Sequence, residues 1–173
     1  MHTGASLISK DGMKLSVEVI IASLYDSKTV RYGIFEHEIS SRREDPDEIV
    51  IEMIDSLLQD GGKVDRSRCF VHSTSWRFEP NSKIVLTYFV YSDLPEFQIR
   101  TNKLLTLHNV VISSSDDTCK PRPVLIAEEH VVAHGMRHIS QLVRQGVQKI
   151  REVLSAEHIS ILEGIESAPA GRI

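Results

Sequence analysis

The sequence predicts a single α+β domain, built as a mixed, mostly antiparallel sheet with helices on both sides. Two observations carry this prediction. Runs rich in β-branched and aromatic residues are spaced as two hairpins, and two segments show the apolar periodicity of amphipathic helices. Because 173 residues are ordinary for one domain, we expect one globular unit over 1–173, with frayed ends at 1–14 and 167–173.

The first predicted hairpin comes early in the chain. Its first strand, Leu15–Tyr25, is β-branched and short for a helix, and its second strand, Thr29–Ile39, alternates in polarity. The segment between them, Asp26-Ser27-Lys28, has the composition of a turn. We therefore expect these two strands to pair.

A helix follows, with clear start and stop signals. Asp45 is the expected N-cap, Pro46 the first helical residue and Glu48 the third-position partner of a capping box. Gly61-Gly62 is expected to end the helix. The predicted inward stripe consists of Val50, Met53, Ile54, Leu57 and Leu58.

The second predicted hairpin, Cys69–Ser92, is the element around which the fold is organised. Two β-rich runs flank Glu79-Pro80-Asn81-Ser82, which has the composition of a turn. The hairpin contains the only tryptophan of the chain, Trp76, together with Tyr88.

The rest of the chain alternates between strand, loop and helix. We expect a strand at Lys103–Ile112, a mobile loop at Ser113–Pro123, a short strand at Val124–Ala127 and one long helix over Glu129–Leu154. Ser155 is the expected cap of a last helix that runs to about Glu166.

Composition and charge exclude several classes of protein. The formal net charge of −4 gives no reason to expect nucleic acid or an anionic membrane as a partner, and the longest apolar runs are too short to span a bilayer. The two cysteines, Cys69 and Cys119, are far apart and predict no disulfide framework, so we expect a cytoplasmic protein.

Charge is unevenly distributed along the chain. Residues 36–60 hold nine acidic and two basic side chains, whereas 130–151 hold four basic side chains and no acidic one. Solvated faces of two helices would account for this pattern. The sharper hypothesis is that the basic helix edge, which includes Arg137, binds an anion.

Three histidines repeat at intervals of four residues, at His130, His134 and His138. Helical spacing places them on one ridge, as in metalloprotease helices, so a divalent metal is an alternative cofactor. However, this ridge lies opposite the Met136 and Val143 stripe, and Gly135 occupies the position where an HExxH motif has glutamate. The simpler interpretation is a polar helix face, and we predict no cofactor.

Strand alternation groups the candidate ligand-binding residues of the second hairpin. His72, Thr74 and Trp76 are expected on one face, and Ser73, Ser75 and Arg77 on the other. Trp76 with Tyr88 would stack on a ring, and Arg77 would bind a phosphate or carboxylate. The alternative is that Trp76 belongs to the core and Arg77 pairs with a neighbouring acid.

The order of these elements resembles that of the Nudix fold, in which a strand pair leads to a helix closed by glycine, then to strands and a C-terminal helix. The family's catalytic box carries Arg-Glu and Glu-Glu pairs before the closing glycine, to hold divalent metal. This chain has Ile54-Asp55-Ser56-Leu57-Leu58-Gln59-Asp60-Gly61 there. The resemblance therefore implies a Nudix-like domain without the family's hydrolase centre.

These observations favour a small-ligand-binding protein, with a nucleotide-like ligand as one option, or an interaction protein. The candidate binding residues are His72, Trp76, Arg77, Tyr88 and Arg137. The sequence does not decide whether the protein is an enzyme, although it argues against it. Two alternatives stay open: a hydrolase with a nonstandard metal site that contains histidine, and a structural homodimer.

Overall fold

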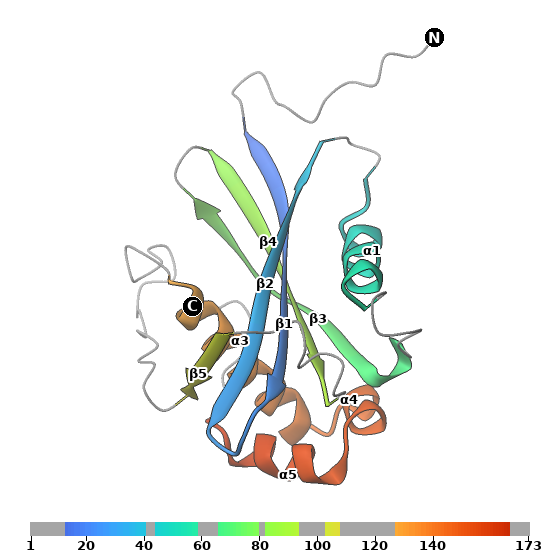
Figure 1. Ribbon diagram of the computed structural model, residues 1–173, viewed down its shortest axis with the longest axis vertical. Coiled ribbons are helices and arrows are strands. Elements are labelled where there is room, and N and C mark those ends of the chain that lie inside the picture. Colours follow the sequence, from blue (N-terminus) through green and yellow to red (C-terminus); the bar gives the residue numbers. More distant parts are fainter. Residues whose placement is uncertain are drawn as a thin grey trace.

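The computed structural model describes residues 13–40, 44–58, 66–79, 82–93, 103–107 and 127–166. These residues form one five-stranded sheet and four α-helices, which confirms the predicted mixed α+β class (Figure 1). The strands are β1 (Lys14–Leu24), β2 (Thr29–Ile39), β3 (Cys69–Glu79), β4 (Lys83–Ser92) and β5 (Lys103–Thr106). The helices are α1 (Pro46–Leu58), α3 (Glu128–Arg144), α4 (Gln148–Val153) and α5 (Ala156–Gly164), and a 3-10 turn, η2 (Arg66–Arg68), precedes β3.

Two hairpins supply four neighbouring strands of the sheet, and their bounds agree with the predicted ones to within a residue. The pairs β1–β2 and β3–β4 are antiparallel. The hairpins meet where β1 and β4 run parallel, with Glu18 opposite Thr87. Strand β5 pairs antiparallel with β2, so the strand order is β3-β4-β1-β2-β5 and β3 lies at an edge.

Alternate residues of β1 divide the apolar core between the two faces of the sheet. Val17, Val19 and Ile21 belong to the cluster packed under α1, whereas Ile20 and Ala22 belong to the larger cluster formed with α3, α4 and α5. We call these two sides the α1 face and the α3 face. In Figure 1, α1 stands apart from the three C-terminal helices, which gather at one end of the sheet.

Helix α1 begins as the sequence predicts. The Asp45 carboxylate accepts a hydrogen bond of 2.8 Å from the Asp47 backbone N–H, which confirms Asp45 as the N-cap. The buried face differs in part from the predicted stripe. Ile49, Val50 and Ile54 are buried, whereas Met53 and Leu57 are only partly buried against the same cluster.

The single helix predicted over Glu129–Leu154 is wrong, because it breaks after Arg144. Gly146 adopts a left-handed φ of 72°, its N–H bonds to the Val143 carbonyl, and the Val147 N–H bonds to the Leu142 carbonyl. These bonds form a Schellman motif, which ends α3 and lets α4 start in a new direction. Ser155 caps α5 as predicted, by accepting a bond from the His158 N–H.

Several predictions fall wholly or partly outside the described residues. Strand β5 ends at Thr106, earlier than the predicted Ile112, and residues 108–112 lie outside the described ranges. The same is true of the loop 113–123, of 124–126, of the glycines at 61 and 62, and of the ends 1–12 and 167–173. No helix in the described part of the chain has both the length and the apolar character needed to cross a bilayer.

Candidate functional site

A cavity of about 640 Å³ lies between α1 and the second hairpin, on the α1 face of the sheet. It forms because α1 packs over the β1 side of this face, where the β1 residues are fully buried, and leaves the β3–β4 side less covered. The cavity is lined by Asp47, Val50, Ile51, Ile54, Ser67, Cys69, Val71, His72, Ser73, Tyr88 and Lys149. Its volume lies in the range of roughly 300–1,000 Å³ that is usual for ligand sites.

Apolar side chains dominate the α1 wall of the cavity. Val50 and Ile54 are buried in the core below it, whereas Ile51 points away from that core and is 44% exposed. On the opposite side Val71 is only partly buried. This wall is therefore suited to an apolar part of a ligand, since covering these side chains would remove apolar surface from water.

Tyr88 and Asp47 form the main polar contact of the cavity. The Tyr88 hydroxyl donates a hydrogen bond of 2.6 Å to the Asp47 carboxylate, which joins β4 to the first turn of α1. Burial and this hydrogen bond raise the pKa of the Tyr88 phenol well above its usual range. Tyr88 is therefore a neutral donor, while Asp47 is an acceptor at the cavity wall.

The other polar end of the cavity is formed by His72 and Lys149. The His72 ring stacks on that of His138, with centroids 4.9 Å apart and an angle of 26° between the planes. Burial, and to a smaller extent the positive charge of Lys149, lower the pKa of His72. Lys149 is the cationic group among the described lining residues, and the imidazole of His72 is biased toward its neutral form.

A β-bulge changes which side chains of β3 share a face. Ser73 lies opposite Tyr88 and Ser75 lies opposite Thr87, so one extra residue, Thr74, is inserted between them. The predicted grouping of His72 with Trp76 is therefore wrong. His72 is on the α3 face, where it stacks on His138, while Trp76, beyond the bulge, lies opposite Leu86 on the same face as Tyr88.

Beyond the cavity, the same face of the hairpin continues as an exposed apolar surface. Trp76 is 68% exposed and Phe78 is 58% exposed, so the alternative that Trp76 belongs to the core is wrong. Their cross-strand partners are Leu86 and Ile84, which are partly buried. We call the cavity and this surface together the open half of the α1 face, with a floor formed by Val71, Ser73, Trp76, Phe78, Ile84, Leu86 and Tyr88.

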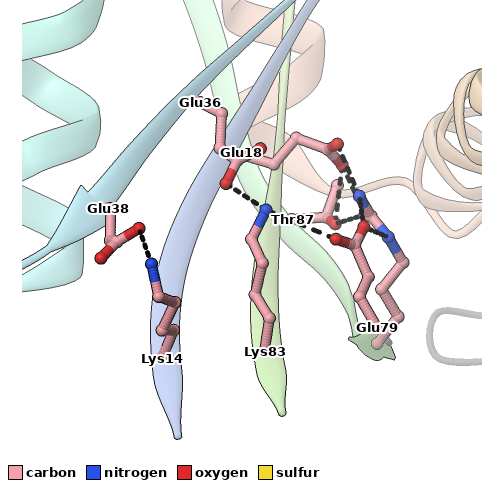
Figure 2. Close-up of polar contacts among 8 residues, drawn as sticks. Lys14, Glu18, Glu36, Glu38, Glu79, Lys83 and Thr87 are labelled. Atoms are coloured by element: carbon pink, nitrogen blue, oxygen red, sulfur yellow. Dashed lines mark hydrogen bonds and ion pairs between the residues drawn. The ribbon is translucent and has the colours of Figure 1, made fainter. Parts of the chain in front are cut away.

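Arg77 lies on the opposite face and is held by acids, as the alternative interpretation predicts. Its guanidinium donates to both Glu18 oxygens at 2.7 and 2.8 Å, to Glu79 and to the Thr87 hydroxyl. Figure 2 shows this network continuing through Lys83 to Glu36. These partners already occupy the guanidinium. Because the members of the network come from β1, β2, β3 and β4, it ties four strands together.

Arg137 is also remote from the main cavity. It pairs with Glu166 at 3.3 Å, beside a second cavity of about 140 Å³ that Lys28 also lines. Of the five predicted binding residues, His72 and Tyr88 line the main cavity, Trp76 extends the same surface, and Arg77 and Arg137 lie elsewhere.

The three histidines of α3 do not form the polar helix face that the sequence predicts. His134 is completely buried and His138 nearly so, and neither ring nitrogen of His134 has a hydrogen-bond partner among the described residues. Burial, followed by the nearby His138 and Arg137, lowers the pKa of His134 to about 4. Within the described ranges, no three histidine, cysteine or acidic side chains are placed to hold a metal ion.

Sequence reasoning missed the α1 wall of the cavity. Ile51 carried a usable signal, because it is an apolar residue outside the predicted inward stripe and next to the exposed Glu52. Asp47 and Lys149 gave no such signal, since only the tertiary fold brings them to β3 and β4.

Comparison with known proteins gives no family assignment. No protein-family model matches the chain, and no curated protein sequence matches it. The resemblance to the Nudix fold stays a prediction.

Proposed function

We propose that this chain is a binding protein without hydrolase chemistry, and that its ligand occupies the open half of the α1 face. The observation that carries the proposal is that a cavity of about 640 Å³ continues into an exposed Trp76 and Phe78. Large exposed aromatic side chains beside a concave apolar wall are typical of recognition surfaces.

The polar groups of the open half are suited to orienting a ligand. Asp47 offers a carboxylate at one wall, Tyr88 holds that carboxylate in place, and Lys149 supplies a positive charge at the other end. A few fixed polar groups around an apolar wall give a binding site its specificity. We further propose that the protein is cytoplasmic and has a Nudix-like fold without the catalytic box. We therefore expect no turnover of nucleoside diphosphate derivatives in the presence of magnesium.

A small nucleotide-like ligand confined to the cavity is the second candidate. It is favoured by the cationic Lys149 at one end of the cavity and by the ring of Tyr88 in its lining, because a cation and a flat ring are the groups that bind a phosphate and a base. This ligand would use the cavity but not Phe78, which lies two residues beyond Trp76 along the strand.

An apolar fluorescent dye tests the proposed location without knowledge of the ligand. We expect anilinonaphthalene sulfonate to bind the wild-type protein and to lose most of its signal in Ile51→Glu and in Trp76→Glu. The matched control is Leu104→Glu on β5, since Leu104 is 56% exposed but lies outside the open half. Thermal melts would verify that each variant is folded.

The result that overturns the proposal is the reverse pattern. If dye binding survives both open-half substitutions and disappears in Leu104→Glu, the recognition surface lies at β5. The single tryptophan provides an independent readout, because a bound ligand that covers Trp76 should shift its emission to shorter wavelength.

A further inference from the structure

We propose that the open half of the α1 face binds one amphipathic α-helix of a partner protein, and that the polar side of this helix is basic. This inference rests on the binding function proposed above and names its ligand.

The open half has the width of one helix. Neighbouring strands lie about 4.8 Å apart, so β3 and β4 together offer roughly 10 Å, and packed helices lie about 8–10 Å from their neighbours. Helix α1 already covers the β1 side of this face through Val50 and Ile54. A second helix beside α1 would extend the helical layer on this face, much as α3, α4 and α5 together pack on the α3 face.

The length of the open half also suits a helix. Strand β3 has 11 residues, which span roughly 36 Å at about 3.3 Å per residue. A helix of about 20 residues spans some 30 Å. Such a helix would place successive apolar residues over Phe78, Trp76 and the cavity beside Tyr88, as helices bound in grooves do at i, i+3, i+4 and i+7.

A partner strand fits the edge of the sheet less well than a helix fits its face. The bulge at Thr74 interrupts the regular register of β3, and Arg77 and Glu79 place charged side chains on the edge strand. Bulges and inward-pointing charges are features that prevent strands from pairing at a sheet edge. The exposed apolar area instead lies on the face, at Trp76 and Phe78.

The charge of the α1 wall sets the charge of the partner. Helix α1 carries Asp47, Glu48, Glu52 and Asp55 and contains no lysine or arginine. Asp47, Ile51 and Asp55 are four residues apart, so they form one ridge, and its first two members line the cavity. A neighbouring helix would therefore meet carboxylates along its side, and lysine or arginine at those positions would complement them.

Among the described residues that line the cavity, Lys149 supplies the opposite charge, at the end where β3 begins. The carboxyl end of a helix carries a partial negative charge. The C-terminal turn of the partner helix therefore fits beside Lys149, which leaves its N-terminal part over Trp76 and Phe78.

Three synthetic helical peptides test the inference. They share one leucine stripe and differ only on the polar side, which carries lysine, glutamine or glutamate. Binding is measured by the emission of Trp76 and by anisotropy of a labelled peptide. We expect the lysine peptide to bind about tenfold more tightly than the glutamine peptide, because several exposed ion pairs together contribute on that order. The glutamate peptide should bind weakest, and added salt should reduce the difference.

Charge reversal on α1 supplies the decisive comparison. The double variant Asp47→Lys with Asp55→Lys, on the ridge that borders the cavity, should lose the preference for the lysine peptide. The matched control is Glu129→Lys with Glu157→Lys, which changes the net charge by the same amount on exposed residues of α3 and α5. Equal loss in both double variants would show nonspecific attraction and would overturn the inference.

Failure of the inference can be separated from failure of the binding function. Dye binding that depends on Ile51 and Trp76, combined with equal affinity for all three peptides, refutes the basic helix but keeps the binding site. If dye binding does not depend on Ile51 and Trp76, and the three peptides also bind with equal affinity, then the binding site and the basic helix are both refuted. A wild-type dimer in sedimentation that Trp76→Glu converts to a monomer would also overturn the inference, because a second copy would then cover the surface.

Discussion

The ring of Phe89 on β4 packs directly against the backbone of Gly135 on α3. A Cβ atom at position 135 would lie 2.2 Å from Cδ2 of that ring, and Phe89 itself is completely buried. Glycine is therefore required at this position by close packing, and it sets the distance at which α3 approaches the sheet.

The substitution Gly135→Ala should lower the free energy of unfolding by about 1–3 kcal/mol, because overpacking must displace α3 or the ring. The better helix propensity of alanine, worth about 1 kcal/mol, only partly offsets this cost. Urea melts measure the change. Gly164→Ala is the control, since no atom lies within 4 Å of the added methyl group, and it should be neutral or slightly stabilising.

The buried ion pair on the α3 face predicts a large effect of Glu18→Gln. The Glu18 carboxylate accepts two bonds from Arg77 and one from Thr87 while it is almost inaccessible to solvent. Removing one partner of a buried pair costs roughly 3–5 kcal/mol, and the remaining Glu79 should keep the loss near the lower value.

The exposed pair in the same region supplies the control for Glu18. Lys14 and Glu38 are 3.2 Å apart on neighbouring strands, and about half of each side chain is exposed (Figure 2). Glu38→Gln should change the free energy of unfolding by less than about 0.5 kcal/mol. If both substitutions cost the same, the Glu18 network does not stabilise the sheet.

His134 predicts a loss of stability in mild acid. Its pKa is about 4 in the folded protein and about 6.5 in the unfolded chain, because burial disfavours the charged imidazolium. The contribution of neutral His134 to the free energy of unfolding is therefore complete above pH 6.5, and it is lost as the pH falls from 6.5 toward 4. The full loss amounts to about 3 kcal/mol. His134→Leu should flatten the dependence of urea midpoints on pH over this window, whereas His130→Gln on the same helix should retain it.

The buried face of α1 can be tested by three alanine substitutions. Ile54 is completely buried, so Ile54→Ala should cost roughly 2–5 kcal/mol. Leu57 is only partly buried, so Leu57→Ala should lower the free energy of unfolding by less. Glu52 is exposed, so Glu52→Ala should change it by less than about 0.5 kcal/mol. A larger cost for Leu57 than for Ile54 would contradict the orientation of the helix.

The local elements were predictable because their signals are local. Each hairpin has its own turn and β-rich strands, and the N-caps Asp45 and Ser155 act within one helical turn. The break at Gly146 was missed because the apolar periodicity of Val143, Val147 and Ile150 continues across it. The glycine itself was the signal, since a left-handed residue at that point ends a helix.

The site was less predictable because it depends on contacts between distant segments. Alternation along β3 groups Trp76 with His72, but the inserted Thr74 moves them to opposite faces. The helical wheel places His134 opposite one apolar stripe, but α3 is enclosed from more than one side. His138 stacks on His72 of β3, while Ser140 bonds to the carbonyl of Ile165 after α5.

The parallel junction between β1 and β4 has a consequence for folding. Each hairpin can form from residues close in sequence, but the junction joins residues about 70 positions apart, so we expect it to form late. If β1 slipped by one residue against β4, its side chains would exchange faces, and Glu18 would enter the apolar cluster under α1. The bonds from Arg77 and Thr87 are available to Glu18 only in the native alignment. The charged network therefore selects the correct docking of two otherwise independent hairpins.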